Sequence, residues 1–263
     1  MLSELVVWTG VKSFPSARRL GYAKAAVSLW SRRRRCAKLW REHEEKTRSF
    51  ILDVARSARR SDTIWLFGAG TLADLPLKDL SAMFRQVLVF DVALLASARR
   101  AVRHLGNVEL RLADVTGVVR PLAEWQPQMP LPLVPVSFMA ELDPVPPDCI
   151  VSVNLLSQLP LLPMEYLRRR GVSRTKTEAF GRAIIEAHLH DLAGLSCPVG
   201  MITDATRFWR SRTGETVMQE SAVLDVRLPV PEREWFWTLA PRGEIDPEAS
   251  LEVRVQASRL NAE

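Results

Sequence analysis

Residues 63–76 limit the possible folds of this chain more than any other stretch. They open with the apolar run Thr63–Phe67, which is typical of a strand buried in a parallel sheet. Gly68 and Gly70 follow at once, and then comes a segment that can begin a helix. Because glycine lacks a Cβ, the backbone can turn sharply there and a ligand can approach its N–H groups. A strand, a glycine turn and a helix N-terminus together predict a nucleotide-type cradle.

The repeat of strand and helix continues after this stretch. Apolar strands are predicted at 86–90, 108–113, 149–153 and 200–203, and helices at 75–84, 93–105 and 177–193. Strands that alternate with helices predict a parallel sheet with right-handed crossovers. Two late strands, 235–240 and 251–256, have no helix between them and should pair as an antiparallel hairpin. The fold class is therefore α/β, with a doubly wound, mostly parallel sheet and a terminal antiparallel pair.

Residues 1–60 differ from the rest of the chain in charge and pattern. They hold 15 Lys and Arg against 5 Asp and Glu, whereas the whole chain has a net charge of +6. Apolar residues recur there at helical spacing, so we expect two helices separated by the run Arg32–Arg35. The run is interpreted as a solvated helix face; an anionic substrate site or an RNA contact is the alternative. We expect an N-terminal helical cap at 1–60 and a core domain at 61–263.

A proline-rich segment interrupts the strand–helix rhythm. Eight of the 17 prolines fall within 121–147, together with many apolar residues. Prolines at this density exclude a regular helix, and the apolar residues argue against free disorder. We interpret 121–147 as an extended cover that packs against the core or over a pocket.

Composition narrows the class of protein. With 263 residues and 47% hydrophobic content, the chain can bury one full α/β domain with additions. No apolar run approaches the ~20 residues of a membrane span, and the N-terminus has no signal-peptide pattern. The three cysteines, Cys36, Cys149 and Cys197, are far apart, which favours a reducing, cytoplasmic location without disulfides. They also lack metal-ligand spacing, so no metal site is expected.

At this point the chain resembles the class I S-adenosylmethionine (SAM)-dependent methyltransferase fold, a Rossmann-like sheet, over about residues 60–258. The resemblance is carried by Gly68-Ala69-Gly70, by Asp91 after the second strand, by Asp114 after the third and by Asn154 after the fourth. The chain is also similar to a group of uncharacterised bacterial proteins. These share a Gly-x-Gly-x-x-x-Asp opening, here residues 68–74, and a Trp-x-Trp-x-x-Ala-Pro ending, here residues 235–241.

The resemblance implies a role for each matching position, with SAM as the cofactor. The segment Gly68-Ala69-Gly70 would pass beside the methionine part of SAM, and Asp91 would accept both ribose hydroxyls. Asp114 would accept from the adenine amino group, and Asn154 would face the methyl donor. These two acids and Asn154 also have structural alternatives, as loop starts or helix caps.

Two positions depart from the family pattern. The first motif usually carries an acid two residues before the first glycine, where this chain has Leu66, and a third glycine, where it has Leu72. Asp74, in the first turn of the following helix, is the candidate to replace the missing acid. Its alternative role is to cap that helix.

A dinucleotide site is the main rival interpretation. The glycine segment fits G-x-G-x-x-A, with an acid about 20 residues further on. Asp74 argues against it, because a pyrophosphate at this helix N-terminus would face a like charge. A short-chain dehydrogenase is disfavoured as well, since neither Tyr22 nor Tyr166 has a lysine four positions later.

Methyl transfer depends on alignment more than on acid–base groups, so the pattern does not identify a catalytic residue. His188 and Tyr166 are the candidates, and His43, Ser157 and Gln158 are candidates for substrate binding. The hypothesis is a SAM-dependent methyltransferase with a small-molecule acceptor. The alternatives are a non-catalytic protein that keeps the fold as a binding module, and an RNA methyltransferase that holds phosphates with Arg32–Arg35.

Overall fold

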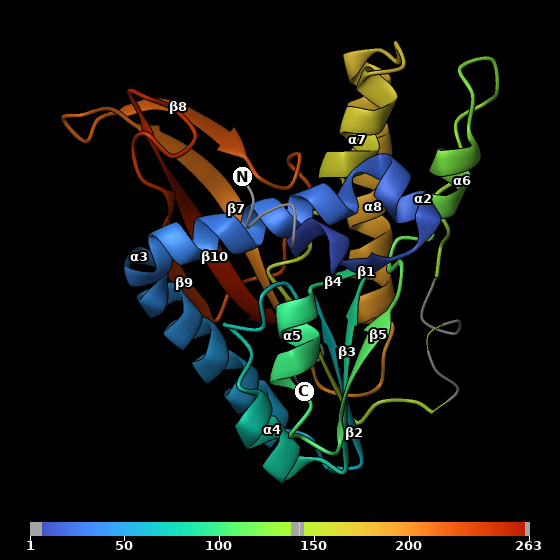
Figure 1. The fold of residues 1–263 in the computed structure, drawn as a ribbon, viewed down its shortest axis with the longest axis vertical. Coiled ribbons are helices and arrows are strands. Elements are labelled where there is room, and N and C mark those ends of the chain that lie inside the picture. The colour runs from blue at the N-terminus through green and yellow to red at the C-terminus, as the bar shows by residue number, and fades with distance from the viewer. Residues whose placement is uncertain (1–6, 138–141, 143–144, 261–263) are drawn as a thin grey trace.

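The computed structural model describes residues 7–137, 142 and 145–260 and contains a large central sheet (Figure 1). Its strand order is β5-β3-β2-β6-β7-β10-β9, with β8 paired to β7 outside this path. The bounds are β2 Thr63–Phe67, β3 Gln86–Asp91, β5 Val108–Leu112, β6 Cys149–Val153, β7 Val199–Arg210, β8 Thr216–Ser221, β9 Arg233–Ala240 and β10 Ser250–Arg259. The first five strands along the order are parallel, and β10, β9 and β8 pair antiparallel. The predicted α/β fold with a mostly parallel sheet and an antiparallel C-terminal pair is confirmed.

Helices cover both faces of this sheet. The bounds are α2 Pro15–Leu20, α3 Tyr22–Arg56, α4 Leu77–Met83, α5 Ala96–Ala101, α6 Val119–Glu124, α7 Leu161–Arg168 and α8 Arg174–Ala193. Alternate residues of β2 point to opposite faces, as the pleat requires. Ile64 and Leu66 pack in one apolar cluster with α3, α4 and α5, whereas Trp65 and Phe67 pack in a second with α2, α6, α7 and α8. The sheet is therefore doubly wound, with one hydrophobic layer on each side.

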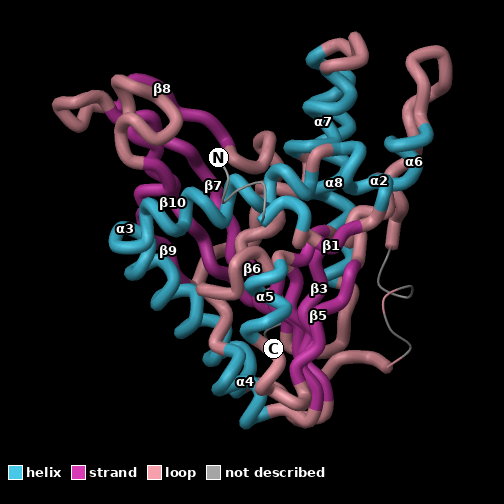
Figure 2. The backbone as a smooth tube through the Cα atoms, viewed as in Figure 1, coloured by secondary structure: helices cyan, strands magenta, loops and turns pink. Residues whose placement is uncertain are grey.

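One helix, α3, replaces the two that we expected in residues 17–60. It runs for 35 residues from Tyr22 to Arg56 without Pro or Gly, and the run Arg32–Arg35 lies inside it. Figures 1 and 2 show that the helix bends, so that its first arm, which begins at Tyr22, and its second arm, which ends at Arg56, run in different directions. The second arm buries Phe50, Ile51 and Val54 against the sheet. Helical periodicity reports the faces of each arm but not whether the backbone breaks between them, which is why the expectation was wrong.

Two further segments differ from expectation. The helix expected at 93–105 is shorter, because only α5 within this range is helical. Before it, the two-residue strand β4 Ala93–Leu94 pairs with β1 Lys12–Ser13. The fifth strand continues past Asp204, because β10 pairs with β7 from Gly200 to Arg210, and past the end of the β6 pairing β8 pairs with Thr206–Arg210.

The proline-rich segment begins inside a helix. Pro121 lies in the first turn of α6, where a missing N–H is tolerated, and Trp125 ends that helix. Leu131 and Val134 then pack against the cluster that contains Trp65 and Phe67. Residues 138–141 and 143–144 of the segment lie outside the described residues. Within the described part of the chain, no helix combines the length and apolarity needed to cross a membrane.

Candidate functional site

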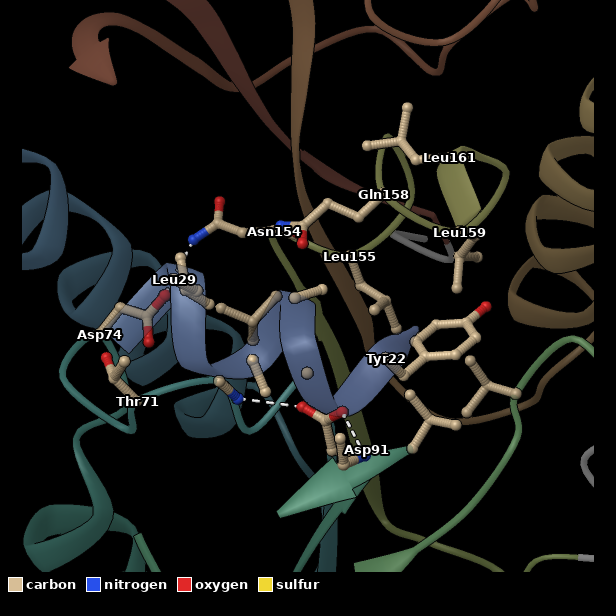
Figure 3. Close-up of a pocket in the computed structure, with 18 of the residues that line it drawn as sticks. Tyr22, Leu29, Thr71, Asp74, Asp91, Asn154, Leu155, Gln158, Leu159 and Leu161 are labelled. Atoms are coloured by element: carbon tan, nitrogen blue, oxygen red, sulfur yellow. Dashed lines mark hydrogen bonds between the residues drawn. The ribbon is translucent and has the colours of Figure 1, made fainter. Parts of the chain in front are cut away.

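A cavity of about 400 Å³ lies at the carboxyl ends of β2, β3, β5 and β6 (Figure 3). The loops after these strands form its floor, and both arms of α3 contribute to its walls, together with α7 and β9. Among the residues on which the cofactor assignment rests, Gly68, Gly70, Asp74, Asp91, Asp114 and Asn154 all line it. None of the described residues between 121 and 147 does. The covering element is thus α3, and the prediction that 121–147 covers the site stays a prediction.

Gly68 brings the turn after β2 close to the neighbouring strand. Its φ is +94°, and a Cβ at this position would lie 2.6 Å from the carbonyl oxygen of Val153. Both the backbone conformation and the contact therefore require glycine. Ala69 is buried beside it, at 1% exposure, and is not among the residues that line the cavity.

Asp91 ends β3 and holds the glycine turn in place. Its Oδ2 accepts the N–H of Gly70 at 3.0 Å, and its Oδ1 accepts the N–H of Ala93 at 3.1 Å (Figure 3). Each carboxylate oxygen can accept a second hydrogen bond, so the group can still bind a ligand. Burial raises the pKa of Asp91, while its backbone hydrogen bonds act in the opposite direction. The sequence placed this carboxylate correctly, at the strand end beside the glycine turn.

The two departures from the family pattern have different structural consequences. Leu66 is fully buried in β2 and does not line the cavity. Leu72 adopts a φ of +64°, a left-handed conformation that is costly for leucine. At Leu72 the backbone therefore has a conformation that glycine would favour, although the residue is a leucine.

Asp114 lies at the cavity but is also a structural cap. Its Oδ1 accepts from both the N–H and the hydroxyl of Thr116, and its Oδ2 accepts the N–H of Val119 at 2.8 Å, at the start of α6. One acceptor position on Oδ2 remains for a ligand. Tyr22, from the first arm of α3, faces the same end of the cavity. Burial raises the pKa of Tyr22, and the charges of Asp114 and Asp91 add to the effect.

Asn154 connects three polar groups at the other end of the cavity. Its φ is +51°, and its Nδ2 lies 2.9 Å from Oδ2 of Asp74 and 3.2 Å from Nε2 of His43. Gln158, which also lines the cavity, donates to the carbonyl oxygen of Asn154 at 2.5 Å. Burial raises the pKa of Asp74 to about 6, and the nearby charge of Glu44 acts in the same direction.

His43 is held by the Trp-x-Trp segment of β9. Trp235 donates its indole Nε1–H to Nδ1 of His43 at 3.1 Å, and the ring of Trp237 stacks on the imidazole with centroids 3.8 Å apart. Trp40 packs edge-on against Trp237. Burial lowers the pKa of His43 to about 3, so the imidazole is neutral at physiological pH.

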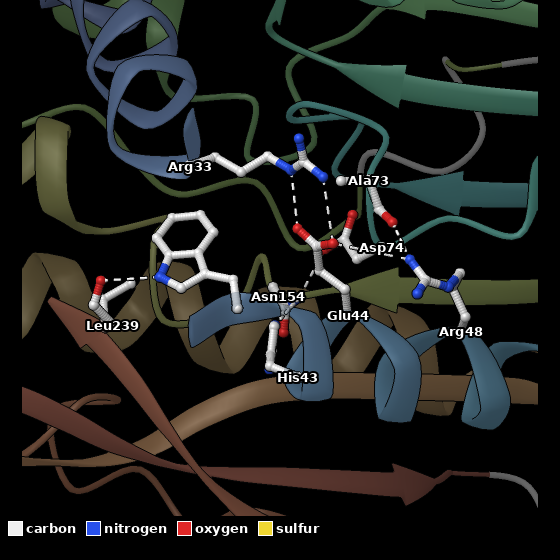
Figure 4. Close-up of polar contacts among 9 residues, drawn as sticks. Arg33, His43, Glu44, Arg48, Ala73, Asp74, Asn154 and Leu239 are labelled. Atoms are coloured by element: carbon white, nitrogen blue, oxygen red, sulfur yellow. Dashed lines mark hydrogen bonds and ion pairs between the residues drawn. The ribbon is translucent and has the colours of Figure 1, made fainter. Parts of the chain in front are cut away.

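Glu44 supplies a further carboxylate from α3. It accepts from Nε of Arg33 at 2.9 Å, and Arg48 donates to the carbonyl oxygen of Ala73 on the loop that carries Asp74 (Figure 4). The charged residues that line the cavity are all acidic: Glu44, Asp74, Asp91, Asp114 and Glu165. No Lys or Arg occurs among the described lining residues. The cavity therefore suits a ligand that carries positive charge and hydroxyl groups, and it disfavours phosphates.

Three candidates lie away from the cavity, where they are buried. Ser157 is fully buried behind the wall. His188 lies with Nε2 at 3.1 Å from the hydroxyl of Ser152, and burial lowers its pKa to about 4. Tyr166 is 5% exposed and stacks under the guanidinium of Arg170. Roles for these three in catalysis or substrate binding stay predictions without support from their positions.

The sequence reasoning missed the residues that α3 and β9 contribute to the walls. These are Tyr22, Leu29, Trp40, Glu44 and Trp237. The shared Trp-x-Trp ending was the available signal for Trp237, since two large aromatic residues on one strand face point to a specific partner. The N-terminal helices were expected to cover the substrate, but nothing in the local pattern indicates which of their residues lie over the glycine turn.

The arginine run has ionic or aromatic partners at each position. Arg33 pairs with Glu44, Arg32 and Arg35 pair with Glu244, and Arg34 lies over the ring of Trp30.

Among the described residues, no group of three His, Cys, Asp or Glu is arranged to hold a metal ion.

No protein-family model matches the sequence, and no curated protein matches it. Similar solved structures include a DhpI–SAH complex, at 15% identity and a TM-score of 0.35, covering 87% of this chain and 94% of that one. Another is SAM-bound CalS10, an amino pentose methyltransferase from Micromonospora echinaspora, at 14% identity and a TM-score of 0.35, covering 85% and 77%. The 23S rRNA methyltransferase ErmE follows at 12% identity and a TM-score of 0.31, covering 82% and 71%. At such TM-scores these likenesses carry no weight for activity, so the function below is derived from the chain's own residues.

Proposed function

We propose that this chain is a SAM-dependent methyltransferase that acts on a small-molecule acceptor. The observation that supports it most is the cavity beside the glycine turn, whose charged lining residues are five acids without a Lys or Arg among the described ones. SAM carries a sulfonium, an ammonium, one carboxylate and two ribose hydroxyls, so its net charge is positive, and it has no phosphate. A dinucleotide would bring its pyrophosphate against Glu44 and Asp74, and the ionised form of either acid would repel it.

The residues present fit this cofactor. Asp91 would accept the ribose hydroxyls with the acceptor positions that Gly70 and Ala93 leave open. Asp74 would bind the ammonium, and Asp114 would accept from the adenine amino group. SAM supplies a methyl group on a positively charged sulfur, which an aligned nucleophile can take. The chain's own contribution is orientation and exclusion of water, which α3 provides by closing over the glycine turn.

The ion pairs of the run Arg32–Arg35 favour a small acceptor over RNA. Arg32, Arg33 and Arg35 already pair with carboxylates, so they offer little free charge to a phosphate backbone. The cavity volume of about 400 Å³ lies in the range of small-molecule sites.

Calorimetric titration with the demethylated product, S-adenosylhomocysteine (SAH), tests the cofactor. We expect saturable binding of SAH and none of ADP-ribose at the same concentration. Asp91→Ala should weaken SAH binding roughly 10- to 100-fold, because it removes hydrogen bonds to a charged group. Asp79→Ala, at an exposed site on α4, is the control. Should Asp91→Ala unfold, Asp91→Asn keeps a neutral acceptor there. Absence of SAH binding, or equal binding of ADP-ribose, contradicts the proposal.

The acceptor class is tested with SAM labelled in its methyl group. The protein is incubated with separated small-molecule and RNA fractions of a cell extract. We expect label in the small-molecule fraction. Label only in RNA would overturn the acceptor class, and SAH binding without transfer to either fraction would favour the non-catalytic binding module.

A further inference from the structure

The hydrogen-bonded chain from Trp235 through His43 and Asn154 to Asp74 fixes where its protons lie. The indole of Trp235 can only donate, so Nδ1 of His43 must accept, at 3.1 Å. A neutral imidazole carries one proton, which therefore sits on Nε2. That Nε2–H faces the side-chain amide of Asn154 at 3.2 Å. Asn154 then presents its carbonyl oxygen, and not its NH₂ group, to His43, and the NH₂ group takes the buried position where no described residue offers it a partner.

This orientation has a consequence for Asp74. The nitrogen and oxygen of an Asn amide are assigned from their hydrogen-bond partners. With the oxygen turned toward His43, the same oxygen lies 2.9 Å from Oδ2 of Asp74. Two oxygens at that distance need a hydrogen between them, and only the carboxyl of Asp74 can carry it.

The other groups around Asp74 are consistent with a protonated carboxyl. Glu44, on α3, contributes a like charge, and Arg33 is engaged by that same Glu44. Arg48, also on α3, donates to the carbonyl oxygen of Ala73. Asn154, the residue that follows β6, is the partner on that side and is uncharged. None of the ion pairs formed within the described residues includes Asp74, and its pKa is raised to about 6.

We propose that His43, held by Trp235, is a positioning residue that keeps Asp74 protonated until the ligand's ammonium replaces that proton. The inference rests on the proposed function, since it assigns the ammonium of SAM or SAH to Asp74. On binding, the O–H bond of Asp74 breaks, the proton leaves to solvent, and the ammonium donates to both Asp74 and the carbonyl oxygen of Asn154. Cofactor binding therefore releases a proton.

Calorimetry of SAH binding at pH 5.5, in two buffers of different ionisation enthalpy, counts the released protons. A carboxyl whose pKa is raised to about 6 is largely protonated at this pH, so we expect the release of most of a proton per SAH bound. Asp74→Asn should abolish this release. His43→Phe should reduce it, because Asn154 can then donate to an ionised Asp74. Trp209→Phe is the control, since Trp209 lies on β7 and is not among the residues that line the cavity, and it should leave the release unchanged.

Nitrogen-15 spectra of His43 give a second readout. They are recorded on the wild-type protein, so the result does not depend on whether a variant folds. We expect a protonated Nε2 and an unprotonated Nδ1. The inference is overturned by a protonated Nδ1, by SAH binding whose heat is independent of the buffer, or by proton release that persists in Asp74→Asn. Absence of SAH binding altogether overturns the proposed function, and the inference with it.

Discussion

The guanidinium of Arg33 meets the carboxylate of Glu44 at 2.9 Å although the two residues lie eleven positions apart on one helix. In a straight α-helix that spacing corresponds to about 16 Å along the axis, beyond the reach of the two side chains. The pair therefore exists only because α3 bends, and it lies on the inside of the bend. Leu29 on one arm and His43 on the other consequently line the same cavity.

A double-mutant cycle on Arg33 and Glu44 measures what this contact contributes to stability. We expect a coupling free energy of about 1–3 kcal/mol, since the hydrogen-bonded pair is partly buried. The pair Arg120 and Glu124 is the control, because both side chains are exposed and four positions apart on α6. Its coupling should stay below about 0.5 kcal/mol in the same urea titrations. Equal couplings for the two pairs would contradict the account of the bend.

Gly68→Ala should be far more harmful than Gly171→Ala. Both glycines have positive φ, +94° and +83°, so both variants carry the backbone cost of about 1 kcal/mol. A Cβ at Gly171 meets nothing within 4 Å, whereas one at Gly68 lies 2.6 Å from the carbonyl oxygen of Val153. Urea denaturation should show an additional loss of at least about 2 kcal/mol for Gly68→Ala. Similar losses at both positions would show that the close approach to β6 is not the constraint.

The backbone strain at Leu72 can be tested by asking which of two variants, Leu72→Gly or Leu72→Ala, is the more stable. Replacement by Ala or Gly removes nearly the same buried side chain, but only Gly tolerates the φ of +64° without cost. Leu72→Gly should therefore be about 1 kcal/mol more stable than Leu72→Ala. At Leu80, buried within α4, the order should reverse by a similar amount, since Gly is the poorer helix former. The same order at both positions would contradict the strain assignment.

Asp204 should lower the free energy of unfolding as the pH rises, whereas most acids in folded proteins raise it. It is buried in β7 with Oδ1 unpartnered, and burial raises its pKa to about 6, above the value of about 3.9 in an unfolded chain. The folded state therefore binds more protons between pH 4 and 6, so this residue lowers stability as pH rises through that window. Asp204→Asn should be about 3 kcal/mol more stable than wild type at pH 7.5.

The difference between the two proteins should vanish at about pH 3, below both pKa values of Asp204. Only the variant-minus-wild-type difference isolates Asp204, because the buried histidines His43 and His188 change the wild-type profile in the opposite sense. Chemical denaturation at several pH values measures it. A variant that is less stable than wild type at pH 7.5 would contradict the prediction.

Local sequence patterns were sufficient for the ends of β2, β3 and β6, but not for the end of β7 or for the walls of the cavity. An acid directly after an apolar strand marked Asp91, because strand length and register are local properties. The contact between His43 and Trp235 joins residues 192 positions apart, and periodicity carries no information about such pairs. The partner of Arg35 is likewise remote, at Glu244. Leu72 could not be predicted to adopt a positive φ, since its side chain disfavours that conformation.

The strand order has a consequence for how the chain is made. Within the described residues β9 joins the sheet only through β10, which spans Ser250–Arg259. During synthesis, α3 and the glycine turn emerge early, yet β9 has no place in the sheet, and Trp235 none beside His43, until β10 has left the ribosome. The apolar side of α3 that β9 covers therefore waits until residues 250–259 have been made. A product truncated before residue 250 would contain Gly68, Gly70 and Asp91 but would lack the wall that holds His43.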